Sequence, residues 1–115
     1  MVRVKRVYER AEKGDGWRVL VDRLWPRGIT KEAAKADVWM KDVAPSDALR
    51  KWFGHEPEKW GAFQKRYRAE LADKKAMIAE LKKMEKEHGT LTLLYGAKDE
   101  EHNQAVVLAE FLKRN

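Results

Sequence analysis

The chain has 115 residues, 43% of them hydrophobic and 38% charged, so we expect one globular domain spanning 1–115. It contains no cysteine, which excludes disulfides, iron–sulfur clusters, thiol catalysis and cysteine-based zinc sites. The formal net charge is +6, but 25 Lys and Arg are interleaved with 19 Asp and Glu, and such a mixture is more typical of a solvated surface than of a nucleic-acid-binding tail.

The first elements are predicted from alternation and from turn signals. Valines alternating with basic residues predict a strand near 2–8, and the apolar run "WRVLV" predicts a second strand at 17–21. The turn signal "GDG" at 14–16 separates them, so the two strands either run parallel or form an antiparallel hairpin. Thr30 is expected to cap a short helix at 31–36, and "DVWMK" at 37–41 predicts a third short strand.

Helices dominate the middle of the chain. Ser46 is expected to cap the short helix "DALRKWF", which Gly54 ends. Apolar residues at steps of three and four continue over 58–88 and predict either one bent helix or two helices with a break at Asp73.

The end of the chain holds the clearest strand, "TLTLLY" at 90–95, followed by a last helix that Asp99 is expected to cap. Short strands alternating with helices predict a small α/β domain with a short, mainly parallel sheet packed by several helices. No apolar run approaches the roughly 20 residues that a membrane span needs, and the basic, strand-like start is unlike a signal peptide, so we expect a cytoplasmic protein with no membrane partner.

Two charged loops directly follow apolar strands. They are "DRLWPRG" at 22–28 and "GAKDEEHN" at 96–103. In open α/β sheets, ligands bind beyond the carboxyl ends of the strands. If the strands at 17–21 and 91–95 are parallel neighbours, the two loops meet at one edge of the sheet and form a pocket there.

This pocket predicts a set of functional residues. Guanidinium and ammonium groups hold phosphate or carboxylate, an aromatic ring can stack on an attached ring, and a carboxylate or imidazole can move a proton if the ligand is turned over. The candidate ligand-binding residues are Arg23, Trp25, Arg27, Tyr95, Lys98 and Asn103, and the candidate catalytic residues are Asp22 and His102.

Each candidate also has a structural explanation. Asp22 and Arg23 can form an ion pair that fixes the turn, and Arg27 can pair with an acid on a helix. Packing is the favoured role for Trp25, and His102 can lie on the buried face of the last helix. His55, His88 and His102 are far apart and lack metal-ligand spacing, so we expect no metal and no cofactor.

Four segments carry a family resemblance over nearly the whole chain: "RVLVDRLWPRG", "DVWMKDVAPSDALRKWFGH", "FQKRYRAEL" and "LTLLYGAKDEEHNQAVVLAEFL". In this order they resemble the YeaO-like family, also called domain of unknown function 488. The resemblance implies a small cytoplasmic prokaryotic protein with an α/β fold and no established activity. The motif positions that carry over are Asp22, Arg23, Trp25, Pro26, Arg27, Gly28, Trp39, Lys41, Pro45, Ser46, Tyr95, Lys98, Asp99, His102 and Asn103.

The resemblance has two limits. Some family members carry transcription-regulator labels, but the sequence shows no helix-turn-helix pattern. More distant branches have a Cys-His-Arg signature in the last loop, where this chain has His102 and Asn103 and no cysteine, so cysteine-dependent chemistry does not carry over.

Three functional hypotheses follow. The first is the binding of a small anionic ligand, such as a nucleotide or sugar phosphate, at the strand ends, with turnover left open. The second is a basic nucleic-acid-binding or regulatory module, because aromatic and basic residues alternate in "KWFGHEPEKWGAFQKRYR". The third is a protein-interaction adaptor that uses an aromatic and methionine-bearing helical face; the oligomeric state is left open.

Overall fold

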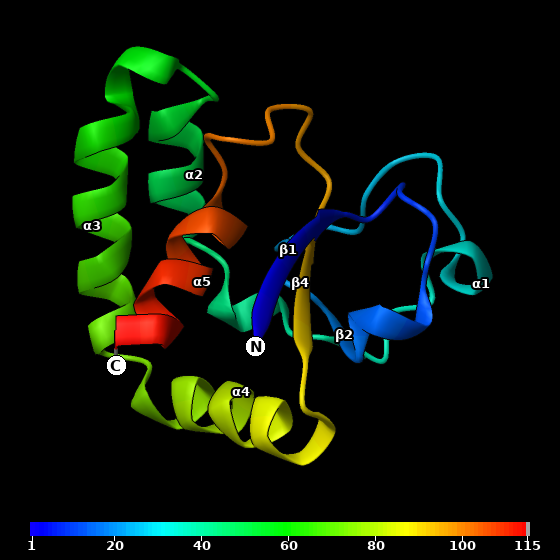
Figure 1. The fold of residues 1–115 in the computed structure, drawn as a ribbon. Helices are drawn as coiled ribbons and strands as arrows, with labels where there is room; N and C mark the ends of the chain where they lie inside the picture. Colours follow the sequence, from blue (N-terminus) through cyan, green and yellow to red (C-terminus); the bar gives the residue numbers. More distant parts are fainter. Residues whose placement is uncertain (115) are drawn as a thin grey trace.

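The sheet of the computed structural model, which describes residues 1–114, consists of four strands within those residues (Figure 1). They are β1 (Val2–Arg6), β2 (Trp17–Leu20), β3 (Val38–Trp39) and β4 (Leu91–Tyr95). The order across the sheet is β1-β4-β2-β3, and every neighbouring pair is parallel. This confirms the predicted α/β fold with its parallel sheet.

The antiparallel hairpin, one of the two arrangements open from sequence, does not form. β4 lies between β1 and β2, and Leu93 pairs with Val4 on one side and with Val19 on the other. Every residue of β4 is buried, so this strand is best placed in the middle of the sheet. Gly16 makes the arrangement possible: its φ is +63°, and a Cβ there would lie 2.2 Å from the Thr90 carbonyl oxygen.

Helices cover one face of the sheet. α2 (Asp47–Phe53), α3 (Trp60–Ala72), α4 (Lys75–His88) and α5 (Gln104–Arg114) contribute to the larger hydrophobic core with the side chains of one sheet face. In Figure 1, α2, α3 and α5 lie together beside the sheet, and α1 (Lys31–Ala34) lies on the other side. A smaller cluster on that second face contains Val7, Leu20, Ala34 and Leu94.

The local capping predictions hold in the middle of the chain. Ser46 caps α2 by accepting a hydrogen bond from the Leu49 N–H at 3.2 Å, and Gly54 ends the helix in the left-handed conformation. Thr30 caps α1, although Lys35 ends that helix earlier than expected. The segment 58–88 is two helices, with the predicted break at Asp73.

The predicted cap of the last helix is wrong. α5 begins at Gln104, and Asn103 is the residue whose side chain accepts a hydrogen bond from the Val106 N–H, at 3.1 Å. The Asp99 carboxylate instead accepts from the N–H groups of Glu101 and His102, which forms a turn before the helix. The helix therefore begins about one turn later than predicted, and the buried Asn103 satisfies one of its free N–H donors, that of Val106.

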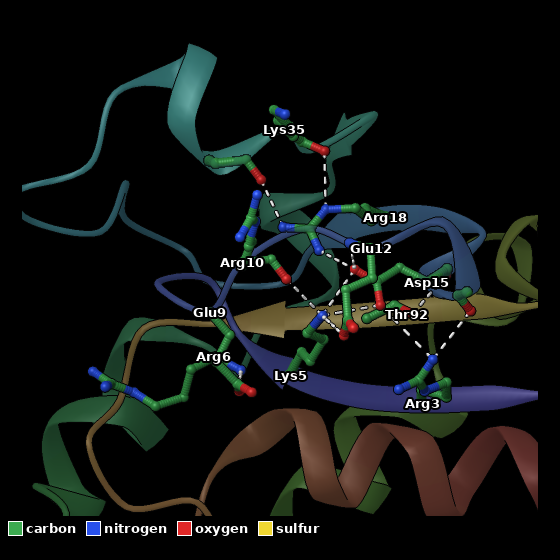
Figure 2. Close-up of polar contacts among 12 residues, drawn as sticks. Arg3, Lys5, Arg6, Glu9, Arg10, Glu12, Asp15, Arg18, Lys35 and Thr92 are labelled. Atoms are coloured by element: carbon green, nitrogen blue, oxygen red, sulfur yellow. Dashed lines mark hydrogen bonds and ion pairs between the residues drawn. The ribbon is translucent and has the colours of Figure 1, made fainter.

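The second face of the sheet carries a row of polar side chains. Arg3, Thr92 and Arg18 occupy paired positions on three adjacent strands, and Asp15 lies over them (Figure 2). Asp15 is fully buried, and Lys5 and Arg18 are nearly so. Lys5 Nζ lies 3.0 Å from both Asp15 carboxylate oxygens, and Arg18 Nη1 donates to the same carboxylate at 2.5 Å.

This group, Lys5, Glu12, Asp15 and Arg18, is called the buried ion network below. Its remaining donors reach carbonyl oxygens: Lys5 that of Arg10, and Arg18 those of Ala34 and Lys35. Burial alone would lower the pKa of Lys5, but its hydrogen bonds to Asp15 and Glu12 raise it above the ordinary value. Burial likewise opposes ionisation of Asp15, yet the hydrogen bonds that it accepts lower its pKa.

Within residues 1–114, no helix combines the length and the apolar character that crossing a membrane requires.

Candidate functional site

The two charged loops meet at the carboxyl edge of the sheet, as predicted. β2 and β4 are parallel neighbours, with Leu20 beside Leu94, so the loops that follow them leave the same edge. The Gly96 N–H, the first of the second loop, donates to Asp22 Oδ2 at 2.9 Å. Figure 1 shows the second loop as the orange segment between β4 and α5.

Gly96 is required for this close approach. A Cβ at position 96 would lie 2.9 Å from Asp22 Oδ2 and 3.2 Å from Pro26 Cβ. The first distance is shorter than real Cβ contacts, and the second would force the buried proline to move. A glycine in the second loop and a rigid proline in the first therefore fit against one another.

Asp22 holds the two loops and the last helix together. Its second carboxylate oxygen, Oδ1, accepts a hydrogen bond from Gln104 Nε2 at the start of α5. Burial raises the pKa of Asp22 to about 6, and the hydrogen bonds from Gly96 and Gln104 keep it from rising further. Its backbone carbonyl also accepts from Trp39 Nε1 at 2.7 Å. Both carboxylate oxygens of this candidate catalytic residue are thus engaged.

The suggested ion pair between Asp22 and Arg23 is replaced by other contacts. Arg23 donates to the carbonyl oxygens of Pro45 and Ala44 at 3.0 and 3.2 Å. Its guanidinium also lies 3.9 Å from Asp42 and 4.0 Å from Asp47. Arg23 therefore anchors the first loop to the segment before α2.

A cleft of about 650 Å³ opens between the loops. We call it the strand-end cleft. Of the described residues, four arginines, one lysine, one histidine (His55) and one carboxylate line it, together with apolar and neutral polar groups. The charged lining residues are Arg6, Asp22, Arg23, Arg27, Arg50 and Lys98; the predicted residues Trp25 and Asn103 line it as well.

Two of the basic residues that line the cleft make no side-chain hydrogen bond or ion pair within the described part of the chain. Arg27 and Lys98 are exposed, and among residues 1–114 neither side chain has a hydrogen-bond or ion-pair partner. They come from the two different loops. The backbone at Arg27 is held by the Tyr8 hydroxyl, which donates to its carbonyl oxygen at 2.5 Å. The loop position is thus fixed, whereas the guanidinium itself is free.

The other cleft cations serve the fold. Arg6 donates to the carbonyl oxygens of Ala97 and Gly96 at 2.9 and 3.3 Å, which ties the second loop to β1. Arg50 pairs with Asp47 at 3.3 Å. Sequence reasoning missed both residues, but Arg6 could have been found, because β1 ends at the same edge as its parallel neighbour β4.

Trp25 makes packing contacts beside the cleft. Its Nε1 donates to the Ile29 carbonyl oxygen at 2.8 Å, and its ring meets Trp39 edge to face at 5.4 Å between centroids. It also packs against the smaller hydrophobic cluster on the second face of the sheet. These contacts hold the ring in place at the cleft wall.

Tyr95 and His102 are not among the described residues that line the cleft. Tyr95 is 2% exposed and belongs to the larger core, in phase with Leu93 on the helix-covered face. His102 precedes α5 and does not lie on its buried face. Its Nδ1 is 2.9 Å from Asp99 Oδ2, and its ring meets Trp60 edge to face at 5.1 Å.

The residues behind the other two hypotheses are largely committed to the core. In the segment 51–68, Phe53, Phe63 and Tyr67 are buried, so these rings are not available to stack on bases. Met77 and Met84 are partly buried against the larger core. No group of three or more His, Asp or Glu in the described part of the chain could hold a metal ion.

Comparison with known proteins identifies relatives of this chain. A family model described as the inactive DUF488-N3 subclade matches residues 1–115. The chain is similar to the uncharacterized protein YeaO of Escherichia coli (strain K12): 46% identity over 112 residues, which cover 97% of this chain and 96% of YeaO. An uncharacterized protein of Mycobacterium tuberculosis (strain ATCC 25618 / H37Rv) is 45% identical over 111 residues, or 96% and 92% of the two chains. No solved structure matches.

Proposed function

The chain belongs to the inactive DUF488-N3 subclade, and we propose that it binds a small anionic ligand in the strand-end cleft without turning it over. One observation carries the proposal. Arg27 and Lys98 line the same cleft, are exposed, and have no partner among the described side chains, whereas the other arginines of the cleft donate hydrogen bonds within the protein.

Two cationic side chains carried by well-anchored loops favour anion binding. Binding a carboxylate or phosphate gives each cation a charge-assisted hydrogen bond, which is stronger than a neutral one. The loops that carry the two cations are fixed by the Asp22–Gly96 hydrogen bond, so little ordering is needed on binding. Arg6 adds positive potential, because its hydrogen bonds go to neutral carbonyl oxygens.

The contacts of the two candidate catalytic residues favour binding alone. Both Asp22 carboxylate oxygens already accept hydrogen bonds from the protein, one from Gly96 and one from Gln104, which gives this carboxylate a structural role. His102 is paired with Asp99 and lies outside the cleft lining. The description of the subclade as inactive agrees with this proposal.

Thermal unfolding tests the proposal. We expect inorganic phosphate and pyrophosphate to raise the Tm progressively, relative to sodium chloride at equal ionic strength, because a ligand that binds only the folded state stabilises it. The double variant Arg27→Ala, Lys98→Ala should lose this response.

The matched control is Arg68→Ala, Lys86→Ala, which removes the same charge at two exposed positions outside the cleft lining. It should respond like the native chain. Equal loss in the control, or no response of the native chain beyond that to sodium chloride, would contradict anion binding in the cleft.

A further inference from the structure

The strand-end cleft has an apolar side as well as a charged one. Among residues 1–114, the large hydrophobic residues that remain exposed are Met1, Tyr8, Leu24 and Trp39, and two of these, Tyr8 and Leu24, line the cleft. Leu24 is 62% exposed in a loop that is otherwise well anchored. The deeper lining includes Pro26, Pro45, Phe53 and Phe63. Exposed apolar side chains gathered at one cleft commonly mark a binding surface.

The neutral polar groups of the cleft are mostly occupied by the fold. The Asn103 side chain donates to the Asp99 carbonyl oxygen and accepts from the Val106 N–H. The Gln104 amide donates to Asp22, whose oxygens are both used. A ligand rich in hydroxyl groups would therefore exchange its hydrogen bonds to water for few hydrogen bonds to these side chains.

We infer that the cleft selects a hydrophobic anion: a phosphate or carboxylate group attached to an aromatic or aliphatic body, in preference to a sugar phosphate. This inference rests on the proposed function. The anionic group meets Arg27 and Lys98, and the apolar body packs on Leu24 and the adjacent rings and prolines. A nucleotide would fit this class through its base, not through its ribose.

Isothermal titration at pH 8 with phenyl phosphate and ribose 5-phosphate separates the two classes. Both are phosphate monoesters and carry nearly the same charge at this pH. We expect phenyl phosphate to bind at least about tenfold more tightly than ribose 5-phosphate. At the usual free energy per unit of buried apolar area, a tenfold difference requires burying about 60 Å² of apolar surface, which is less than a phenyl ring offers.

Two variants assign the effect to the residues named. Leu24→Ser should weaken phenyl phosphate about fivefold without weakening ribose 5-phosphate, because the serine removes apolar contact, adds a hydroxyl and leaves both cations in place. Leu24 is largely exposed, so the variant is expected to fold. Arg27→Ala, Lys98→Ala should weaken both ligands equally. The ratio of the two affinities in each variant is the internal control.

The outcomes are distinguishable. Equal or tighter binding of ribose 5-phosphate overturns the inference and leaves the proposed function standing. The same holds if Leu24→Ser weakens both ligands to the same extent. If neither monoester binds the native chain, anion binding itself is refuted, and the inference falls with it.

Discussion

The buried ion network and the strand-end cleft use the same residue types in opposite ways. In the network, the charges of Lys5 and Arg18 are matched by a buried carboxylate, and their remaining donors reach carbonyl oxygens. In the cleft, Arg27 and Lys98 are exposed and have no partner among the described residues. The comparison distinguishes basic residues that are paired within the fold from basic residues that remain available to a ligand.

The difference also affects how many of the basic side chains can contact a partner. Residues 1–28 are the most basic segment of the sequence, yet Lys5 and Arg18 within it are neutralised internally, and Arg3 lies 3.8 Å from Asp15. The number of basic side chains available to partners is therefore smaller than composition indicates, and two of the available ones, Arg27 and Lys98, line the cleft. This favours a small anion over the long phosphate backbone of a nucleic acid.

The largest expected effect is that of Asp15→Ala, which breaks the network. It leaves Lys5 and Arg18 buried without their common carboxylate, and removing one partner of a buried ion pair costs about 3–5 kcal/mol. Urea unfolding should show this loss in the free energy of unfolding. Asp73→Ala, at an exposed helix end, is the control and should change it by less than about 0.5 kcal/mol. A loss below about 1 kcal/mol in Asp15→Ala would mean that the network contributes little.

Asp22→Asn tests the carboxylate of the cleft through the pH dependence of the free energy of unfolding. The folded pKa of Asp22 is about 6 against 3.8 for the free group, so the folded state holds its proton more tightly. The native chain therefore loses stability at this site as pH rises from about 4 to 6, by as much as about 3 kcal/mol.

An asparagine cannot ionise, and its amide can still accept from Gly96. The free energy of unfolding of Asp22→Asn should thus rise relative to that of the native chain between pH 4 and pH 7, so the variant becomes relatively more stable. Asp73→Asn, at an exposed helix end, is the matched control for the substitution itself. A constant difference between Asp22→Asn and the native chain across this range would argue against a raised pKa.

Gly96→Ala tests the contact between the loops. The new Cβ would meet Asp22 and Pro26 at 2.9 and 3.2 Å, and such overpacking typically costs about 1–3 kcal/mol. Gly61→Ala is the matched control, because nothing lies within 4 Å of its Cβ position and alanine favours a helix by up to about 1 kcal/mol. Opposite signs in urea unfolding are expected; a stable Gly96→Ala chain would show that the loops can separate at low cost.

These sites also show how far the sequence could be interpreted. The meeting of the two loops was predictable, because buried strands imply parallel neighbours and parallel neighbours share a carboxyl edge. The Ser46 cap was predictable because it depends on four consecutive residues. The start of α5 was not, since two residues able to cap, Asp99 and Asn103, lie four positions apart and only tertiary burial selects the second.

Which basic residues are buried in ion pairs depends on neighbours across the sheet, so it is harder to predict from the sequence. A partial signal exists: Lys5 is in phase with Val7, and Arg18 with Leu20, so alternation directs both charged residues toward a buried face. What the sequence does not contain is the partner, because Asp15 comes from a turn whose position over the strands is set by the complete fold.

The smallest expected effect on stability is that of the double variant Arg27→Ala, Lys98→Ala. It removes two positive charges, as would loss of Lys5 and Arg18, but from exposed side chains with no partner among residues 1–114. Its free energy of unfolding without ligand should stay within about 0.5 kcal/mol of the native value, and it should rise slightly if the cleft cations repel one another. Urea unfolding in phosphate-free buffer measures this. If the free energy of unfolding fell as much as in Asp15→Ala, the two cations would be stabilising the fold. The distinction between paired and available basic residues would then fail at the cleft.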